Sequence, residues 1–307
     1  MILIVSHKED FTTDYLVNIL NKKNVKYLRF NTDDIVDKHK ILIHSENNKI
    51  SISIDDVKKF HSVWYRRTKI PSVLFDNIIE RNLFSKDIIN FTKSIFQLIK
   101  AEKWLSNPYK ISDSENKLLQ LKYAVEIGFK VPNTIISNTK NEIINFYKEN
   151  RENVILKPLY NGRVIDGENQ KLIFTNKLNF DEFLKEEYLS FPILFQENVQ
   201  KDYEIRVTIV DKKIFSAKVK SQENPNSKID WRRERLKFEP IVLPNEINKM
   251  CFEIVHSLGL NFGAIDLIKD KNGDYIFLEI NPNGQWVWIE IDTGLKISDA
   301  IIEFLTN

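Results

Sequence analysis

Hydrophobic and polar positions along this chain follow two periods, and these periods predict its secondary structure. Alternating positions or short unbroken apolar runs indicate strands, whereas apolar positions at intervals of three and four indicate helices. The first third reads as a β-α-β start, followed by a hairpin around two asparagines, another strand and a long helix. The corresponding residues are 1–6, 14–24, 25–31, 41–56, 62–68 and 77–100.

A boundary follows at Asn107 and Pro108, because the residue before proline avoids the helical conformation. The next helix is expected to be capped by one of residues 112–114 and to end at Gly128. Further helices are predicted over residues 140–150, 180–187 and 250–260, and strands over 131–137, 153–159, 171–176, 192–199, 204–221 with a turn, 262–268 and 275–280. We therefore expect an α/β (α+β) fold with domains at residues 1–105, 106–195 and 196–307.

Two apolar runs near the C-terminal end are separated by Asn272 and Gly273, a step that strongly favours a β-hairpin. Glu279 and Asn281 are two residues apart, so their side chains share one face of a strand. Asp266 can supply a third oxygen if the two runs pair as neighbouring strands. Oxygen ligands suit a hard cation such as Mg²⁺. In the alternative interpretation, Glu279 and Asn281 only end an edge strand in solvent.

Composition and charge exclude several classes of function. Lys and Arg (45) nearly balance Asp and Glu (43), and the formal charge of +2 argues against a protein that coats nucleic acid, which would need a basic face. The single Cys251 rules out an internal disulfide framework, and no secretory signal is seen at the start. No apolar run reaches the length of a membrane span. We expect a cytoplasmic protein with no nucleic-acid or membrane partner.

Lysine and glutamate side chains mark a candidate nucleotide site. Lys157 ends a predicted apolar strand, where an ammonium group is costly unless it meets an anion such as a phosphate. Lys117, on an earlier helix, can reach the same anion, although each lysine alone fits a solvated surface position better. The strand that ends at Gln196 and Glu197 offers donors and acceptors to an adenine edge, and Glu204 can accept from ribose hydroxyls.

Arg206 is two residues from Glu204, so both side chains face the same side of a strand. An arginine at this position can stabilise negative charge that develops on a transferred phosphoryl group or on a tetrahedral intermediate, which makes Arg206 the candidate catalytic residue. In the alternative interpretation, Arg206 only forms a structural salt bridge with Glu204.

The motifs ILKPL, QENV, EIRV, AIDL and FLEINPNGQW follow one another between about residue 107 and the end of the chain. In this order they resemble the ATP-grasp superfamily of carboxylate ligases. The resemblance implies a pre-ATP-grasp domain followed by central and C-terminal domains that enclose ATP. It also implies ligands for the phosphates (Lys117, Lys157), the adenine (Gln196, Glu197, Val199), the ribose (Glu204) and Mg²⁺ (Asp266, Glu279, Asn281). The loop of residues 160–167 has fewer glycines than many phosphate loops of the superfamily.

Three other stretches, VWYRRTKIP, KIDWRRERLKFEP and NPNGQWVWIE, resemble the graspetide synthetases, which are maturases of microviridin-type and grasp-with-spasm peptides. Such enzymes use ATP to join Asp or Glu side chains of a ribosomally made precursor to Thr, Ser or Lys side chains, forming macrocyclic esters or amides. The resemblance implies a precursor peptide partner with a leader and an acidic, Thr- and Lys-rich core, and it is compatible with a homodimer. We expect the leader to dock within residues 185–220.

Arginines and one aspartate are the candidate substrate contacts. The positions are Arg66 and Arg67 in the first domain and Asp230, Arg232 and Arg233 in the third. Packing with a solvated rim, or a solvated charged loop, is the alternative for each group. Two other functions stay open, namely ligation of free amino acids to a carboxylate and a non-catalytic ATP-binding regulatory protein. The intact set of candidate metal ligands argues against the second.

Overall fold

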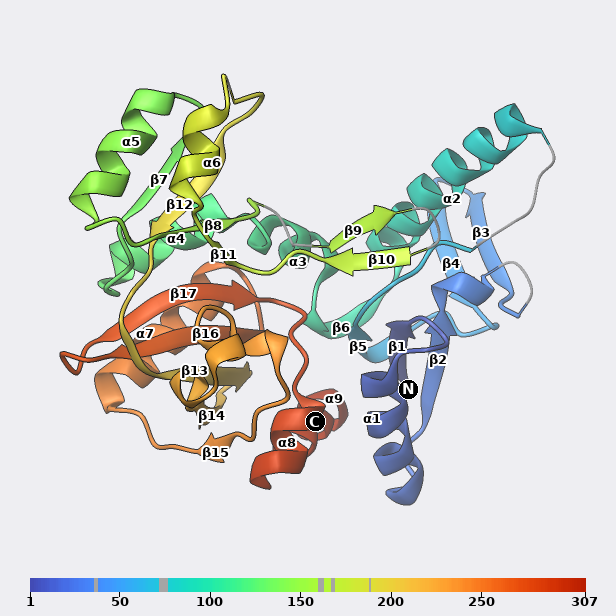
Figure 1. Cartoon of the computed structure of the whole chain (residues 1–307). Helices are drawn as coiled ribbons and strands as arrows, with labels where there is room; N and C mark the ends of the chain where they lie inside the picture. Colours follow the sequence, from blue (N-terminus) through green and yellow to red (C-terminus); the bar gives the residue numbers. More distant parts are fainter. Residues whose placement is uncertain (36–37, 72–76, 160–162, 167–168, 188) are drawn as a thin grey trace.

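The computed structural model describes residues 1–35, 38–71, 77–159, 163–166, 169–187 and 189–307, and only the backbone at 163–166 and 169–172. It has a mixed α/β fold in which an N-terminal domain lies beside a central domain and a C-terminal domain (Figure 1). The helices that it describes include none that is long and apolar enough to cross a membrane.

The N-terminal domain is built on a parallel sheet with strand order β2-β1-β5-β6. The predicted β-α-β start is confirmed. Its strand β6 was missed, because this edge strand carries Glu102 and Lys103 and lacks a clear period of two. The elements are β1 (Ile2–Ser6), α1 (Phe11–Lys22), β2 (Tyr27–Asn31), β5 (Phe60–Tyr65), α2 (Ile78–Leu98) and β6 (Ala101–Ser106).

A separate hairpin of this domain consists of β3 (Ile41–Glu46) and β4 (Lys49–Ile54), as predicted. Asn47 and Asn48 form its turn with φ angles of 49° and 58°. Two successive left-handed residues match the twist of a two-residue hairpin, and asparagine tolerates this conformation better than most residues.

The helix expected from residues 112–114 to Gly128 is two helices, α3 (Pro108–Ser114) and α4 (Lys117–Ile127). The prediction placed the cap wrongly, because the Asn116 side chain accepts from the backbone N–H groups of Leu118 and Leu119 and begins a new helix there. The predicted end at Gly128 is confirmed, with a left-handed φ of 99°.

The central domain has a sheet with strand order β11-β8-β12-β7. The single strand predicted over residues 171–176 is wrong, since the chain there leaves one hairpin and enters another sheet. The elements are β7 (Thr134–Ser137), α5 (Lys140–Glu149), β8 (Val154–Lys157), the hairpin of β9 (Arg163–Asp166) and β10 (Asn169–Leu172), β11 (Asn176–Lys177), α6 (Phe180–Lys185) and β12 (Ile193–Glu197).

The C-terminal domain has an antiparallel sheet with strand order β15-β14-β13-β16-β17. Both predicted hairpins are confirmed, with turns at Asp211 and at Gly273. The last helix packs into the core of the N-terminal sheet, where Ser62 Oγ donates to the Leu305 carbonyl at 2.6 Å. The elements are β13 (Lys201–Val210), β14 (Lys213–Val219), β15 (Glu239–Pro240), α7 (Asn245–Ser257), β16 (Phe262–Asp270), β17 (Tyr275–Asn281), α8 (Val287–Thr293) and α9 (Ile297–Thr306).

Candidate active site

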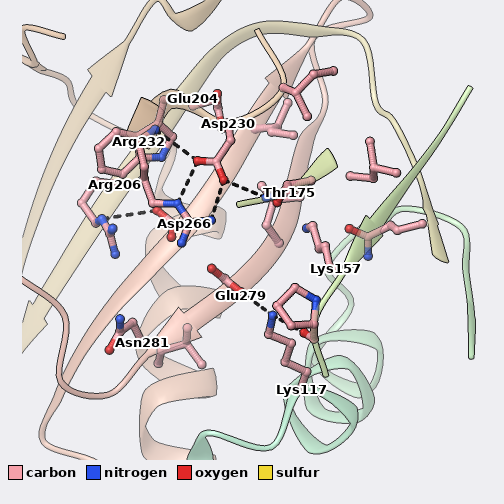
Figure 2. Close-up of a pocket in the computed structure, with 18 of the residues that line it drawn as sticks. Lys117, Lys157, Thr175, Glu204, Arg206, Asp230, Arg232, Asp266, Glu279 and Asn281 are labelled. Atoms are coloured by element: carbon pink, nitrogen blue, oxygen red, sulfur yellow. Dashed lines mark hydrogen bonds and ion pairs between the residues drawn. The ribbon is translucent and has the colours of Figure 1, made fainter. Parts of the chain in front are cut away.

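A cavity of about 340 Å³ lies between the central sheet and the C-terminal sheet, and residues of α4, of the loop at 229–232 and of α8 also line it. Figure 2 shows polar side chains from several of these elements pointing into this space. The wall includes most of the predicted site residues: Arg67, Lys117, Lys157, Gln196, Glu197, Val199, Glu204, Arg206, Asp230, Arg232, Asp266, Glu279 and Asn281. Gly162 and Gly167, which belong to the predicted phosphate loop, lie outside the described residues.

Three charged side chains form a row across neighbouring strands of the C-terminal sheet. Arg206 on β13 is the register partner of Asp266 on β16, and Asp266 is the partner of Glu279 on β17. Arg206 Nε lies 3.3 Å from Asp266 Oδ1. A register shift next to Asp266 leaves Leu278 unpaired, so Leu278 and Glu279 both reach the cavity wall. Strand pairing therefore brings one cation and two carboxylates together.

The two carboxylates repel one another, and their surroundings shift their pKa values in opposite directions. Burial raises the pKa of Asp266 to about 6; Arg206 opposes the shift and the charge of Glu279 adds to it. Burial also acts to raise the pKa of Glu279, but Lys117 and Lys157 bring that pKa below its ordinary value. A divalent cation would offset the repulsion of the two acids.

Asn281 completes the candidate metal site with an amide oxygen at the same cavity wall. Within the described ranges, no group of three or more His, Cys, Asp or Glu side chains could hold a metal ion, so the two acids need this third oxygen. Two carboxylates and an amide are oxygen ligands of the kind that Mg²⁺ takes. The residues present therefore fit Mg²⁺.

Two lysines supply positive charge next to these acids. Lys117 is the first residue of α4, and its Nζ donates to the Pro158 carbonyl at 2.8 Å and lies 3.5 Å from Glu279 Oε2. Lys157 is the last residue of β8 and lines the cavity on the same side of Glu279 as Lys117 (Figure 2). Ammonium groups beside a helix N-terminus can hold the oxygens of a phosphate chain.

Nucleotide affinity is expected to depend on the charge of Lys157. Burial lowers the pKa of this lysine to about 8, and the nearby Lys117 contributes to the lowering. A bound phosphate favours the protonated form, so affinity should be constant below pH 8 and fall by about tenfold per pH unit above it. Calorimetric titration of ADP between pH 7 and 9.5 measures this change. In Lys157→Arg, whose side chain stays charged, the ADP affinity should no longer fall above pH 8. An equal fall in both proteins would contradict the assignment of Lys157 to the phosphates.

On β12, which pairs with the strand of Lys157, Gln196 lines the cavity and offers an acceptor with no partner among the described residues. Its side chain is buried, its Nε2 donates to Thr134 Oγ1 at 2.9 Å, and its Oε1 finds no hydrogen-bond partner in the described part of the chain. Glu197 and Val199 follow on the same wall. A buried acceptor without a partner is costly, and an exocyclic amino group of a base would satisfy it.

Glu204 is held by a buried lysine that the sequence interpretation missed. Lys201 Nζ donates to Glu204 Oε1 at 3.0 Å and to the Ile229 carbonyl at 3.0 Å. The alternative of a salt bridge between Arg206 and Glu204 is therefore wrong, because Arg206 pairs with Asp266 instead. Lys201 lies three residues before Glu204 in an alternating strand, and a β-bulge at its position places both side chains together.

The loop of residues 229–233 closes one side of the cavity through Asp230. The carboxylate accepts from Arg232 Nη2 at 2.6 Å and from the Thr175 backbone N–H at 3.2 Å. Burial acts to raise the pKa of Asp230, but these bonds to Arg232 lower it overall. The loop is thereby tied to the central domain, and Arg232 lines the cavity with a fixed charge (Figure 2).

Two predicted substrate contacts are not among the residues that line this cavity. Arg233 donates to the Thr175 carbonyl and to Asn176 Oδ1, both at 2.8 Å, and Arg66 is 1% exposed. The wall also includes aromatic side chains that the sequence interpretation did not assign to it, namely Trp231 and Trp288. Both tryptophans lie in stretches that were singled out as motifs, but periodicity alone does not separate a wall residue from a core residue.

Comparison with protein families identifies both parts of the chain. Residues 1–112 match the family model described as the MvdD pre-ATP grasp domain, and residues 114–305 match that of the RimK-like ATP-grasp domain. Among characterised proteins, a tetrahydromethanopterin:alpha-L-glutamate ligase from Methanocaldococcus jannaschii is 25% identical over 204 residues, which cover 65% of this chain and 68% of that protein. The alpha-aminoadipate–LysW ligase LysX from Sulfurisphaera tokodaii is 25% identical over 213 residues, which cover 67% of this chain and 72% of LysX.

Solved structures resemble the chain over its whole length. The RiPP-associated ATP-grasp ligase of Chryseobacterium gregarium, solved with ADP and a leader and core peptide, superimposes with a TM-score of 0.88 at 26% identity, covering 99% of this chain and 96% of that one. The macrocyclase MdnC from Microcystis aeruginosa, bound with precursor peptide MdnA, gives a TM-score of 0.83 at 27% identity over 100% of both chains.

Proposed function

Because this chain belongs to the RimK-like ATP-grasp family, we propose that it is a graspetide synthetase. It activates Asp or Glu side-chain carboxylates of a ribosomally made precursor peptide and joins them to Thr, Ser or Lys side chains of the same peptide. The products are macrocyclic esters or amides, with ADP and phosphate released.

The observation that carries this proposal is the N-terminal domain. Residues 1–112 match the MvdD pre-ATP grasp domain, and the structural likeness to a ligase solved with a leader and core peptide extends over 99% of the chain. The likeness to the amino-acid ligases covers about two thirds of it. A peptide ligase needs surface beyond its nucleotide site to hold a flexible substrate, and we assign leader docking to residues 185–220, of which Tyr188 is not described.

We assign the nucleotide and metal roles to the cavity wall. Lys117 and Lys157 hold the phosphates of ATP, and Gln196, Glu197 and Val199 contact the adenine, with the free Gln196 Oε1 accepting from its amino group. Glu204, oriented by Lys201, accepts from the ribose hydroxyls. Mg²⁺ is held by Asp266, Glu279 and Asn281, and when bound it neutralises phosphate charge during transfer.

The proposed chemistry begins with activation of a peptide carboxylate. A carboxylate is a poor electrophile, so a peptide carboxylate oxygen takes the terminal phosphoryl group of ATP, giving an acyl phosphate and ADP. A hydroxyl or amine of the peptide then attacks the carbonyl carbon and loses its proton, and phosphate leaves. Arg206 stabilises the negative charge on the tetrahedral intermediate. Arg67 and Arg232 attract the acidic core, and no nucleophile of the enzyme is needed.

Co-expression with a precursor tests the proposal directly. A short peptide rich in Thr, Lys, Asp and Glu, encoded near the gene, should lose about 18 Da for each ring closed, because every ligation releases one water overall. Mass spectrometry of the peptide measures the loss, and tandem fragmentation locates the rings. Co-expression with the Asp266→Asn variant is the control and should leave the mass unchanged. A precursor that stays linear with active enzyme would contradict the proposal.

The likeness to ligases named for glutamate and α-aminoadipate substrates favours a second candidate, ligation of a free amino acid to a carboxylate. In that case the acceptor would gain the mass of an amino-acid residue for each turnover. The same mass measurement, repeated with free amino acids and ATP, therefore separates the two functions.

A further inference from the structure

The turn that follows the candidate metal ligand Asn281 is packed tightly against the sheet. Gly284 N–H donates to the Asn281 carbonyl at 3.2 Å, and Asn283 N–H donates to Asn281 Oδ1 at 3.0 Å. A Cβ atom at Gly284 would lie 2.3 Å from the Cβ of Ala264, which is the register partner of Asn281. The orientation of the Asn281 amide thus depends on the conformation of this turn.

Arg66 holds the outer side of the turn from the N-terminal domain. Its Nη1 donates to the carbonyls of Asn283 and Gly284 at 3.1 and 3.3 Å, and its Nη2 donates to Gln285 Oε1 at 3.3 Å. In return, Asn283 Nδ2 donates to the Arg66 carbonyl at 2.8 Å. Gln285 also accepts from Thr12 Oγ1, so the first domain contacts three successive residues of the turn.

Arg66 is itself fixed. It directly follows β5, where its backbone N–H donates to the Val5 carbonyl at 2.8 Å. Its Nε forms an ion pair with Asp10 Oδ2 at 3.6 Å, and that oxygen accepts hydrogen bonds from Ser6 Oγ and Thr13 Oγ1 at 2.9 and 2.8 Å. The buried guanidinium therefore contacts Asp10 on one side and the turn on the other. These contacts fix the position of the turn relative to the N-terminal sheet.

We propose that Arg66 is a positioning residue of the Mg²⁺ site, through which the N-terminal domain orients the Asn281 amide. The inference rests on the proposed assignment of Asp266, Glu279 and Asn281 to the metal. It replaces the earlier expectation of a substrate contact at Arg66. Partners that orient a metal ligand typically contribute about 10- to 100-fold to metal affinity. The N-terminal domain would then orient a metal ligand in addition to contacting the substrate.

The test measures how Mg²⁺ and ADP bind together, without any turnover. In Arg66→Lys, calorimetric titration of Mg²⁺ into protein saturated with ADP should show affinity lowered by about 10- to 100-fold. The affinity for ADP without Mg²⁺ should change by less than about twofold, because the substitution leaves the proposed phosphate ligands Lys117 and Lys157 and the adenine contact Gln196 unchanged. A merely structural role would lower the melting temperature and leave the Mg²⁺ affinity of the folded protein as in the wild type, which would overturn the proposal.

Two further variants keep the result clear. Arg29→Lys is the matched control, because Arg29 is also hydrogen-bonded within the N-terminal domain, to Asp14 and Asn31, and should leave both affinities unchanged. Asn283→Ala removes the side-chain hydrogen bond to the Arg66 carbonyl, so it tests the turn even if Arg66→Lys does not fold. It should also lower the Mg²⁺ affinity. A wild-type Mg²⁺ affinity in this variant would overturn the proposal. If wild-type protein binds Mg²⁺ with ADP but modifies no peptide, the proposed function fails, and the Mg²⁺ affinities of Arg66→Lys and Asn283→Ala still decide this inference.

Discussion

Asp266→Asn and Glu279→Gln should each abolish ATP consumption, with kcat lowered by at least about 10³-fold. Each substitution keeps the side-chain volume but removes a carboxylate from the pair that faces the cavity across β16 and β17. If these acids hold Mg²⁺ as proposed, the site would then no longer bind the cation that neutralises the phosphates. Phosphate release in the presence of the precursor measures turnover.

The fold should survive the Asp266→Asn change. Burial raises the pKa of Asp266 to about 6, so at neutral pH the ionised carboxylate is held in the folded state at a cost that a neutral amide avoids. Because the amide also loses the ion pair with Arg206, which opposes this gain, we expect a melting temperature close to that of the wild type without Mg²⁺ and nucleotide. Asp274→Asn, in the turn of the same hairpin and outside the cavity wall, is the control and should keep full turnover. Retained turnover in both cavity variants would defeat the metal assignment.

Arg206→Gln should lower kcat by about 10²- to 10³-fold while changing the KM for ATP by less than about threefold. The guanidinium lies beside Asp266 at the cavity wall. In the mechanism that we propose, negative charge develops there only after ATP and peptide are bound. Its loss therefore removes an interaction made mainly in the transition state. Steady-state rates of phosphate release with the precursor, measured over a range of ATP concentrations, give both constants.

The pH of this assay matters, because Arg206 also opposes the raised pKa of Asp266. Without the arginine, the pKa of Asp266 would rise further, so the kcat of both proteins should be compared at several pH values between about 7 and about 9. Lys213→Gln is the matched control, a cation on the adjacent strand that pairs with Glu303 away from the cavity. A kcat of Arg206→Gln within about threefold of the wild type would leave Arg206 with a structural role alone.

Local signals predicted much of the fold. The turns at Asn47–Asn48 and at Asn272–Gly273 are hairpins, and the end of α4 at Gly128 is as expected, because each depends on backbone conformations that a few residues determine. Predictions failed where two signals competed within a short stretch. Asn116 begins a new helix where one long helix was expected, and residues 171–176 divide between two sheets.

The sequence by itself determined that Glu279 and Asn281 share the end of a strand and that Asp266 lies on the strand before it, because a period of two and an Asn-Gly turn act over a few residues. Only the tertiary structure decided that β13 lies beside β16 and pairs Arg206 with Asp266, that Lys201 turns toward Glu204, and that Arg66 is buried against the turn after Asn281. Such partners come from distant parts of the chain. Their choice depends on how whole domains bury apolar surface together, as α9 does against the N-terminal sheet, and no local pattern encodes that packing.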